Sequence, residues 1–123
     1  MQSLTKAEEQ VMTVLWKLEK AFVKELLQEF PEPKPAYNTI STIVRILQTK
    51  GFVDHESFGK SHRYFPLISK DEYSSFSLRE IMTRHFSGSA SNLLSFFAKE
   101  EQVDPNELEE LLAELKRNNP PES

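Results

Sequence analysis

The sequence contains no cysteine among its 123 residues, which excludes disulfide bonds, thiolate zinc sites and cysteine nucleophiles. It also lacks any apolar run near the roughly 20 residues that a membrane-spanning helix needs. No apolar stretch near Met1 has the pattern of a signal peptide. We therefore expect a soluble, cytoplasmic protein without membrane insertion, built as one ordinary domain or two small ones.

Signatures of catalysis are missing as well. The three histidines, His55, His62 and His85, have neither metal-ligand spacing nor a carboxylate one helical turn away. The sequence has no glycine-rich phosphate loop and no Gly-x-Ser-x-Gly motif, and its C-terminal carboxylates lack the calcium-loop pattern. These absences predict a protein that is not an enzyme and that needs no metal or cofactor.

Positive charge is scarce overall, since the net charge is −4, but it is unevenly distributed. Residues 1–70 carry ten Lys/Arg and eight Asp/Glu, whereas residues 71–123 carry five and eleven. The acidity is therefore concentrated in the C-terminal part. Because the local field decides whether a polyanion can approach, the N-terminal part remains compatible with nucleic-acid binding.

A stretch without any carboxylate runs from Tyr37 to Gly51, and its periodicity predicts a helix with one apolar side. Solvated helix faces usually carry Glu/Lys pairs, whereas a helix that lies against DNA needs small, polar and basic side chains. Such residues reach base edges in a major groove, and we assign this role to Asn38, Ser41, Thr42 and Arg45. On this stretch alone, an ordinary amphipathic core helix is an equal alternative.

The elements expected around this stretch are three helices followed by a two-stranded hairpin. This order predicts a winged helix-turn-helix. A capping box at Thr5 and Glu8 opens the first helix, and Gly51 suits the left-handed position after the third. Pro66 places the end of the returning strand at a sheet edge. The second helix is expected at Phe22–Phe30, followed by a stiff turn at Pro31–Pro35. The third helix is expected at Tyr37–Lys50, and the two strands at Phe52–Phe58 and His62–Ile68.

Flanking groups supply the expected phosphate contacts, which position a protein on DNA without reading its sequence. Lys34 and Tyr37 lie before or at the start of the third helix, and Lys60 and Arg63 lie in the hairpin. These few cations favour modest affinity per chain, and hence two copies that bind two half-sites.

Residues 71–118 are predicted to form a small all-helical dimerisation domain, with residues 119–123 as a frayed tail. Ser69 and Glu72 form a second capping box, and Pro105 starts the last helix. These helices have nothing large to pack against, so a homodimer is the economical arrangement; folding back as a monomer is the alternative. The apolar side chains assigned to dimerisation are Tyr73, Phe76, Ile81, Phe86, Leu93, Leu94, Phe96, Phe97, Leu108, Leu111, Leu112 and Leu115.

The block from Tyr37 to His55, followed by Arg-Tyr-Phe-Pro-Leu at 63–67, resembles the BlaI/MecI/CopY family of bacterial repressors, and residues 4–16 resemble that family's first helix. The resemblance implies a mostly α-helical protein with a winged helix DNA-binding domain at 1–70. It further implies a homodimer with intertwined C-terminal helices that binds a palindromic double-stranded DNA operator. Repression would then concern genes for β-lactam resistance or copper handling.

Two departures limit what the resemblance implies. The copper-responsive branch uses a cysteine motif that is absent here, which excludes a thiolate metal switch. In the β-lactam branch, a membrane sensor metallopeptidase system leads to cleavage between Asn and Phe in the dimerisation helices, and the similar bond here joins Ser95 to Phe96. The alternative for Phe96 and Phe97 is a role in the dimer core, and the alternative for the whole chain is a protein-interaction winged helix that never meets DNA.

Overall fold

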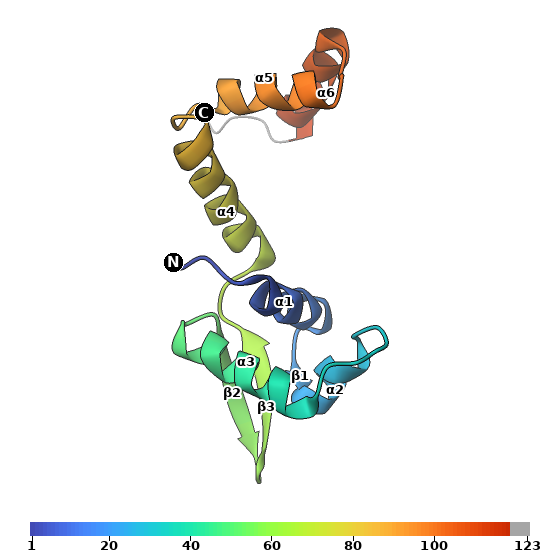
Figure 1. Cartoon of the computed structure of the whole chain (residues 1–123), viewed down its shortest axis with the longest axis vertical. Coiled ribbons are helices and arrows are strands. Elements are labelled where there is room, and N and C mark those ends of the chain that lie inside the picture. The colour runs from blue at the N-terminus through green and yellow to red at the C-terminus, as the bar shows by residue number, and fades with distance from the viewer. Residues whose placement is uncertain (119–123) are drawn as a thin grey trace. The chain divides into compact units, whose positions relative to one another are not determined.

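The computed structural model describes residues 1–118, except for the side chains of Leu115, Lys116 and Asn118. The predicted tail at 119–123 and the predicted dimer contact of Leu115 therefore lie outside the described residues. No helix in the described part is long and apolar enough to cross a membrane. The elements, shown in Figure 1, are α1 (Lys6–Leu18), β1 (Ala21–Phe22), α2 (Val23–Gln28), α3 (Tyr37–Thr49), β2 (Val53–Phe58), β3 (Ser61–Pro66), α4 (Lys70–His85), α5 (Ala90–Glu100) and α6 (Pro105–Asn118).

The chain divides into two compact units, Met1–Ser77 and Leu78–Ser123. In unit 1, α3 packs on α1, α2 and β2, while α1 also packs on β3. The apolar sides of these elements meet in one core, because each presents its hydrophobic residues at the expected helical or strand period. That core contains Val11, Met12, Leu15, Ala21, Val23, Leu26, Ile40, Val44, Leu47, Phe52, Val53, Tyr64 and Tyr73.

The sheet has three antiparallel strands in the order β1-β3-β2, where the sequence predicted a two-stranded hairpin. The predicted helix Phe22–Phe30 begins one residue later, because Ala21 and Phe22 pair with Tyr64 and Arg63. Two residues are too few to give a strand pattern in the sequence. The strand β3 is therefore central and not an edge strand, and its Pro66 lies past the two residues that β1 pairs with.

Gly51 ends α3 and turns the chain into the hairpin, as predicted. Its φ of 83° is in the left-handed region that glycine adopts without strain. The N–H of Gly51 donates to the Gln48 carbonyl at 3.0 Å and the N–H of Phe52 donates to the Leu47 carbonyl at 3.0 Å. This pair of bonds is a Schellman motif, and it directs the Phe52 ring into the core, where the residue is fully buried.

The first turns of α4 belong to unit 1, where Tyr73 and Phe76, which the sequence assigned to dimerisation, pack in or against the core. The Tyr73 hydroxyl donates to Glu9 Oε1 at 2.8 Å and accepts from the Leu4 N–H at 3.2 Å. Its ring lies 5.7 Å from the Phe52 ring, centroid to centroid, and Phe76 packs against the same core. An apolar period cannot tell a partner chain from the same chain's core, which is why the sequence did not indicate this packing.

Unit 2 leaves much of its apolar surface open in the single chain. No residue of α5 is buried, and Phe96 and Phe97 are 53% and 49% exposed. The Ser89 hydroxyl caps α5 through the Asn92 N–H. Of the other residues assigned to dimerisation, Ile81, Leu111 and Leu112 are exposed, and Phe86, Leu93, Leu94 and Leu108 are half-buried.

A buried ion pair joins the start of α1 to the end of α3. Glu8 is 4% exposed, and it is the one charged residue that is buried in the described part of the chain. It completes the predicted capping box with Thr5 and also accepts a hydrogen bond from Lys50 Nζ at 2.9 Å. Burial raises the pKa of the Glu8 carboxyl, but the hydrogen bonds from Lys50 and Thr5 together outweigh burial, so the pKa lies below its ordinary value of 4.5.

We predict that Glu8→Gln lowers the free energy of unfolding by about 1–3 kcal/mol at neutral pH, because Lys50 loses its charged partner. The wild-type contribution is complete above pH 4.5 and is lost as the pH falls through the lowered folded-state pKa of Glu8. Urea unfolding across this range should therefore show the two proteins converging in acid. Glu29→Gln, which removes the exposed ion pair with Lys17, is the control and should cost less than about 1 kcal/mol. Equal losses for both variants would contradict the role of Glu8.

Candidate nucleic-acid interface

The outward side of α3 carries the residues that the sequence assigned to base contacts. Asn38, Thr42 and Arg45 are exposed and Ser41 is half-buried. The opposite side of the helix is sealed, with Ile40, Val44 and Leu47 at most 2% exposed. The absence of carboxylates from Tyr37 to Gly51 is therefore a property of a molecular surface, which an ordinary core helix would not require.

Hydrogen bonds along α3 decide what its side chains offer to a ligand. The Thr42 hydroxyl donates to the Asn38 carbonyl at 2.8 Å. With its proton used, Thr42 presents oxygen lone pairs and a methyl group, which suit a base amino group or the thymine methyl. Arg45 is held along the helix by longer bonds to Ser41, from Nε to the carbonyl at 3.3 Å and from Nη2 to Oγ at 3.4 Å. Its remaining N–H donors are available on the surface.

The hairpin is tied to α3 through a histidine. Gln48 Oε1 lies 3.0 Å from His55 Nδ1, and the His55 ring stacks on the His62 ring with centroids 4.0 Å apart. Side chains alternate along a strand, so His55, His62 and Tyr64 share one face of the sheet, whereas Glu56 and Arg63 share the other. The first of these faces borders α3, which makes α3 and the hairpin one continuous surface.

The four residues predicted to contact phosphates fall into two pairs. Tyr37 is 53% exposed, and Lys60 is exposed in the hairpin turn, with no ion pair among the described residues. Lys34 Nζ instead donates to the Phe30 and Gln28 carbonyls at 2.7 and 3.0 Å, at the C-terminal end of α2. Arg63 contacts its own sheet face, where Nη2 lies 3.5 Å from Glu56 and the guanidinium lies over the Phe58 ring.

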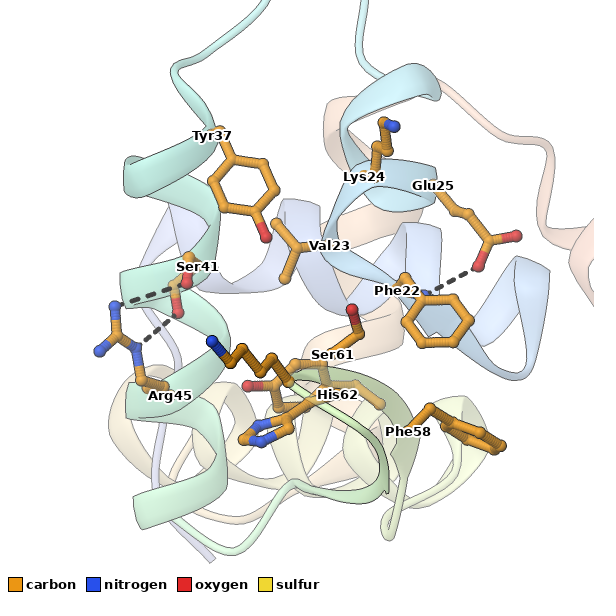
Figure 2. Close-up of a pocket in the computed structure, with 12 residues that line it drawn as sticks. Phe22, Val23, Lys24, Glu25, Tyr37, Ser41, Arg45, Phe58, Ser61 and His62 are labelled. Atoms are coloured by element: carbon orange, nitrogen blue, oxygen red, sulfur yellow. Dashed lines mark hydrogen bonds between the residues drawn. The ribbon is translucent and has the colours of Figure 1, made fainter.

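A groove of about 650 Å³ lies between the start of α2, the outward side of α3 and the hairpin. Figure 2 shows Tyr37 on its α3 side and Ser61 and His62 in the hairpin, while Arg45 lies along α3 and bonds to Ser41. Lys24, His62 and Tyr64 also line it, and the sequence analysis did not select them. The alternation along β3 could have indicated His62 and Tyr64, but the position of Lys24 depends on the short strand β1.

Tyr64 contributes a neutral donor to this groove. The residue is 4% exposed. Burial raises the pKa of its phenol above the ordinary value of 10.0, against the opposing effect of the nearby Arg45 charge. The hydroxyl therefore keeps its proton at neutral pH, and as a phenol it can donate a hydrogen bond.

Other candidate chemistry is absent from the described residues or belongs to unit 2. No group of three or more His, Cys, Asp or Glu side chains that could hold a metal occurs in the part that the structure describes. Ser95 and Phe96, which flank the predicted cleavage bond, are exposed in α5 of unit 2.

Comparisons with known proteins match nearly the whole chain. The sequence model of the penicillinase repressor family matches residues 4–117. The methicillin resistance regulatory protein MecI of Staphylococcus aureus strain N315 is 25% identical over 109 residues, which cover 88% of this chain and 89% of MecI. The penicillinase repressor of Bacillus licheniformis is 26% identical over 109 residues, covering 88% of this chain and 85% of that repressor.

A solved structure matches part of the chain. The solution structure of the DNA-binding domain of the repressor BlaI superposes with a TM-score of 0.51 at 28% identity, covering 59% of this chain and 94% of that domain. The winged-helix architecture and the mostly helical fold class predicted from the sequence are thereby confirmed.

We predict different effects for two lysines that the sequence placed in one class. Lys34→Met should lower the free energy of unfolding by about 0.5–1.5 kcal/mol, because carbonyls at the end of α2 lose their donor. Lys60→Met keeps the apolar stem of an unpaired side chain and should leave the free energy of unfolding unchanged. Urea unfolding of both variants measures this difference, and a stability loss at Lys60 that equals the loss at Lys34 would contradict the assignment.

Proposed function

Because the chain belongs to the penicillinase repressor family, whose members are transcriptional repressors, we propose that it represses transcription by binding a palindromic operator as a homodimer. The observation that carries this proposal is the outward side of α3, which is exposed, free of carboxylates and continuous with the hairpin. Such a surface suits the concave, negatively charged wall of a DNA groove.

In the proposed complex, α3 lies in the major groove, which is about 12 Å wide and admits one helix. Asn38, Ser41, Thr42 and Arg45 meet base edges there. Tyr37 and Lys60 supply the phosphate contacts that fix orientation. Lys34 and Arg63 join them only after giving up their contacts with α2 and with Glu56, so we assign them the smaller share.

The homodimer is proposed from unit 2. Leu78, Ile81, Phe96, Phe97, Leu111 and Leu112 remain between 37% and 53% exposed in the single chain. A two-fold partner would bury this surface, and the hydrophobic effect contributes about 25 cal/mol for each Å² removed from water. Two winged helices on one particle would then bind two half-sites, which offsets the small number of cations in each.

Relief of repression by proteolysis is part of the same proposal. The bond between Ser95 and Phe96 lies within α5, which has no buried residue. Local unfolding of a helix with so little burial costs little, and a peptidase needs such an opening to reach the backbone. Cleavage there would separate α6 from the rest of unit 2 and remove part of the dimer surface.

We predict that Arg45→Ala weakens binding to the operator by about 1–3 kcal/mol and weakens binding to scrambled DNA much less, because its guanidinium reads a base. Fluorescence anisotropy with both DNAs at one stated salt concentration measures this. Arg117→Ala, which removes an exposed arginine of α6, is the matched control and should change neither affinity.

Three outcomes would count against this account. Equal weakening on both DNAs would place Arg45 at a phosphate, and no weakening on either would remove it from the interface. Failure of the dimeric wild type to shift the DNA upstream of its own gene, even at low salt, would favour a protein-interaction module whose acidic C-terminal part docks a basic partner.

We also predict that Phe97→Glu raises the dimer dissociation constant by about 30-fold or more, because a charge would have to be buried at an apolar contact. Sedimentation equilibrium measures the constant directly. Ser91→Glu adds the same charge at an exposed position of the same helix and should leave the dimer intact. A wild-type chain that stays monomeric at high concentration would exclude the homodimer.

A further inference from the structure

The groove beside α3 contains a buried donor that has no acceptor. Tyr64 is 96% buried, by its exposed fraction of 4%, yet it lines the groove. Its hydroxyl makes no hydrogen bond with any residue that the structure describes. That oxygen is also not among the fully buried atoms without a partner, so it keeps some exposed surface, and the groove is an opening that Tyr64 lines. A donor in this position is poised for a ligand atom that accepts hydrogen bonds.

Positive charge surrounds the same opening. Arg45, Lys24 and Lys60 line the groove from α3, α2 and the hairpin turn. Glu25 is the one carboxylate among the lining residues, and its Oε1 accepts a hydrogen bond from the Phe22 N–H at 2.9 Å within the start of α2. The groove therefore has three cations against one carboxylate that is already engaged, which favours an anionic ligand.

Neutral hydroxyls complete the lining. Tyr37 and Ser41 extend from α3, and Ser61 extends from the hairpin; Figure 2 shows these side chains around one opening. A phosphate group presents several acceptor oxygens at once and is commonly held by ammonium and hydroxyl donors together.

We propose that this groove binds a phosphate group, with Tyr64, Lys24 and Lys60 as its donors, while Arg45 at its α3 edge contacts a base. The proposal rests on the proposed function and extends it, because it names the DNA backbone as the source of the phosphate. In that case the phosphodiester strand at the edge of the DNA major groove passes through the groove of the protein. The protein groove has a volume of about 650 Å³, which accommodates the adjoining sugars. A free phosphomonoester shares the same chemistry and is distinguished by the experiment below.

The test removes the single hydroxyl. Tyr64→Phe retains the ring in the core and deletes the donor, so it should weaken binding to operator and to scrambled DNA by the same factor, about tenfold. No charge is removed, so the slope of log affinity against log salt should be unchanged. Because the hydroxyl has no partner in its own chain among the described residues, the thermal unfolding midpoint should not fall.

Tyr73→Phe is the matched control, since it removes the hydroxyl of a second buried tyrosine in unit 1. That hydroxyl bonds to Glu9 and to the Leu4 N–H, away from the groove. This variant should unfold at a lower temperature and bind both DNAs as the wild type does. The two variants thereby separate a binding role from a structural one.

A second arm uses inorganic phosphate as the probe, added to the full-length protein without DNA at constant ionic strength. Amide chemical shifts of Ser41, Arg45 and Tyr64 should move in the wild type and stay fixed in Tyr64→Phe. Loss of phosphate shifts together with equally weakened DNA binding supports a backbone phosphate as the ligand. Loss of phosphate shifts with unchanged DNA binding supports the groove as a site for a free phosphomonoester.

Other results overturn the proposal. Weakening by Tyr64→Phe on the operator alone would mean that the hydroxyl contacts a base. No change of DNA affinity and no phosphate-induced shift would exclude a phosphate site, while the proposed repressor function would stand on Arg45. If the wild type bound no DNA at all, the repressor function would be excluded. The titration with inorganic phosphate would then still test whether the groove binds phosphate.

Discussion

The buried ion pair between Glu8 and Lys50 ties α3 to α1. Glu8 forms the capping box of α1, and Lys50 follows the last turn of α3, so the pair fixes the start of one helix to the end of the other. A partly buried charge pair is useful only when both partners stay in place, because either charge alone in the interior is costly. The pair therefore fastens the C-terminal end of α3 to α1, beside the core contacts of Ile40, Val44 and Leu47, and Gly51 leads from that end into the hairpin.

The electrostatics of this surface depend on where charges are absent. The chain is acidic overall, with a net charge of −4, but α3 carries no carboxylate. Glu25 beside the groove is engaged by the backbone, and Glu56 lies on the opposite face of the sheet with Lys20 and Arg63. A polyanion that approaches α3 would therefore meet few negative charges, which a total charge cannot reveal.

The helices were predictable from the sequence because their signals are local. Capping residues at Thr5 and Ser69, the apolar period of α3 and the left-handed Gly51 each act within a few residues. The strand β1 was missed because Ala21 and Phe22 are extended only through pairing with β3, which lies far along the chain. The contacts of Lys34 and Arg63 within the chain were not predicted for a similar reason, since the positions of the Phe30 carbonyl and the Phe58 ring are set by the fold and not by spacing.

The first turns of α4 close the core of unit 1 through Tyr73, and this has a consequence for the proposed cleavage in α5. A chain cut at Ser95 would keep Tyr73, Phe76 and every residue of that core, so its winged-helix unit 1 would stay folded. Release from an operator would then come from lost avidity, since two copies of unit 1 that are joined in a dimer bind far more tightly than two separate copies. The N-terminal fragment would keep its affinity for a single half-site. De-repression would then result from the loss of two-site binding and not from unfolding of the DNA-binding domain.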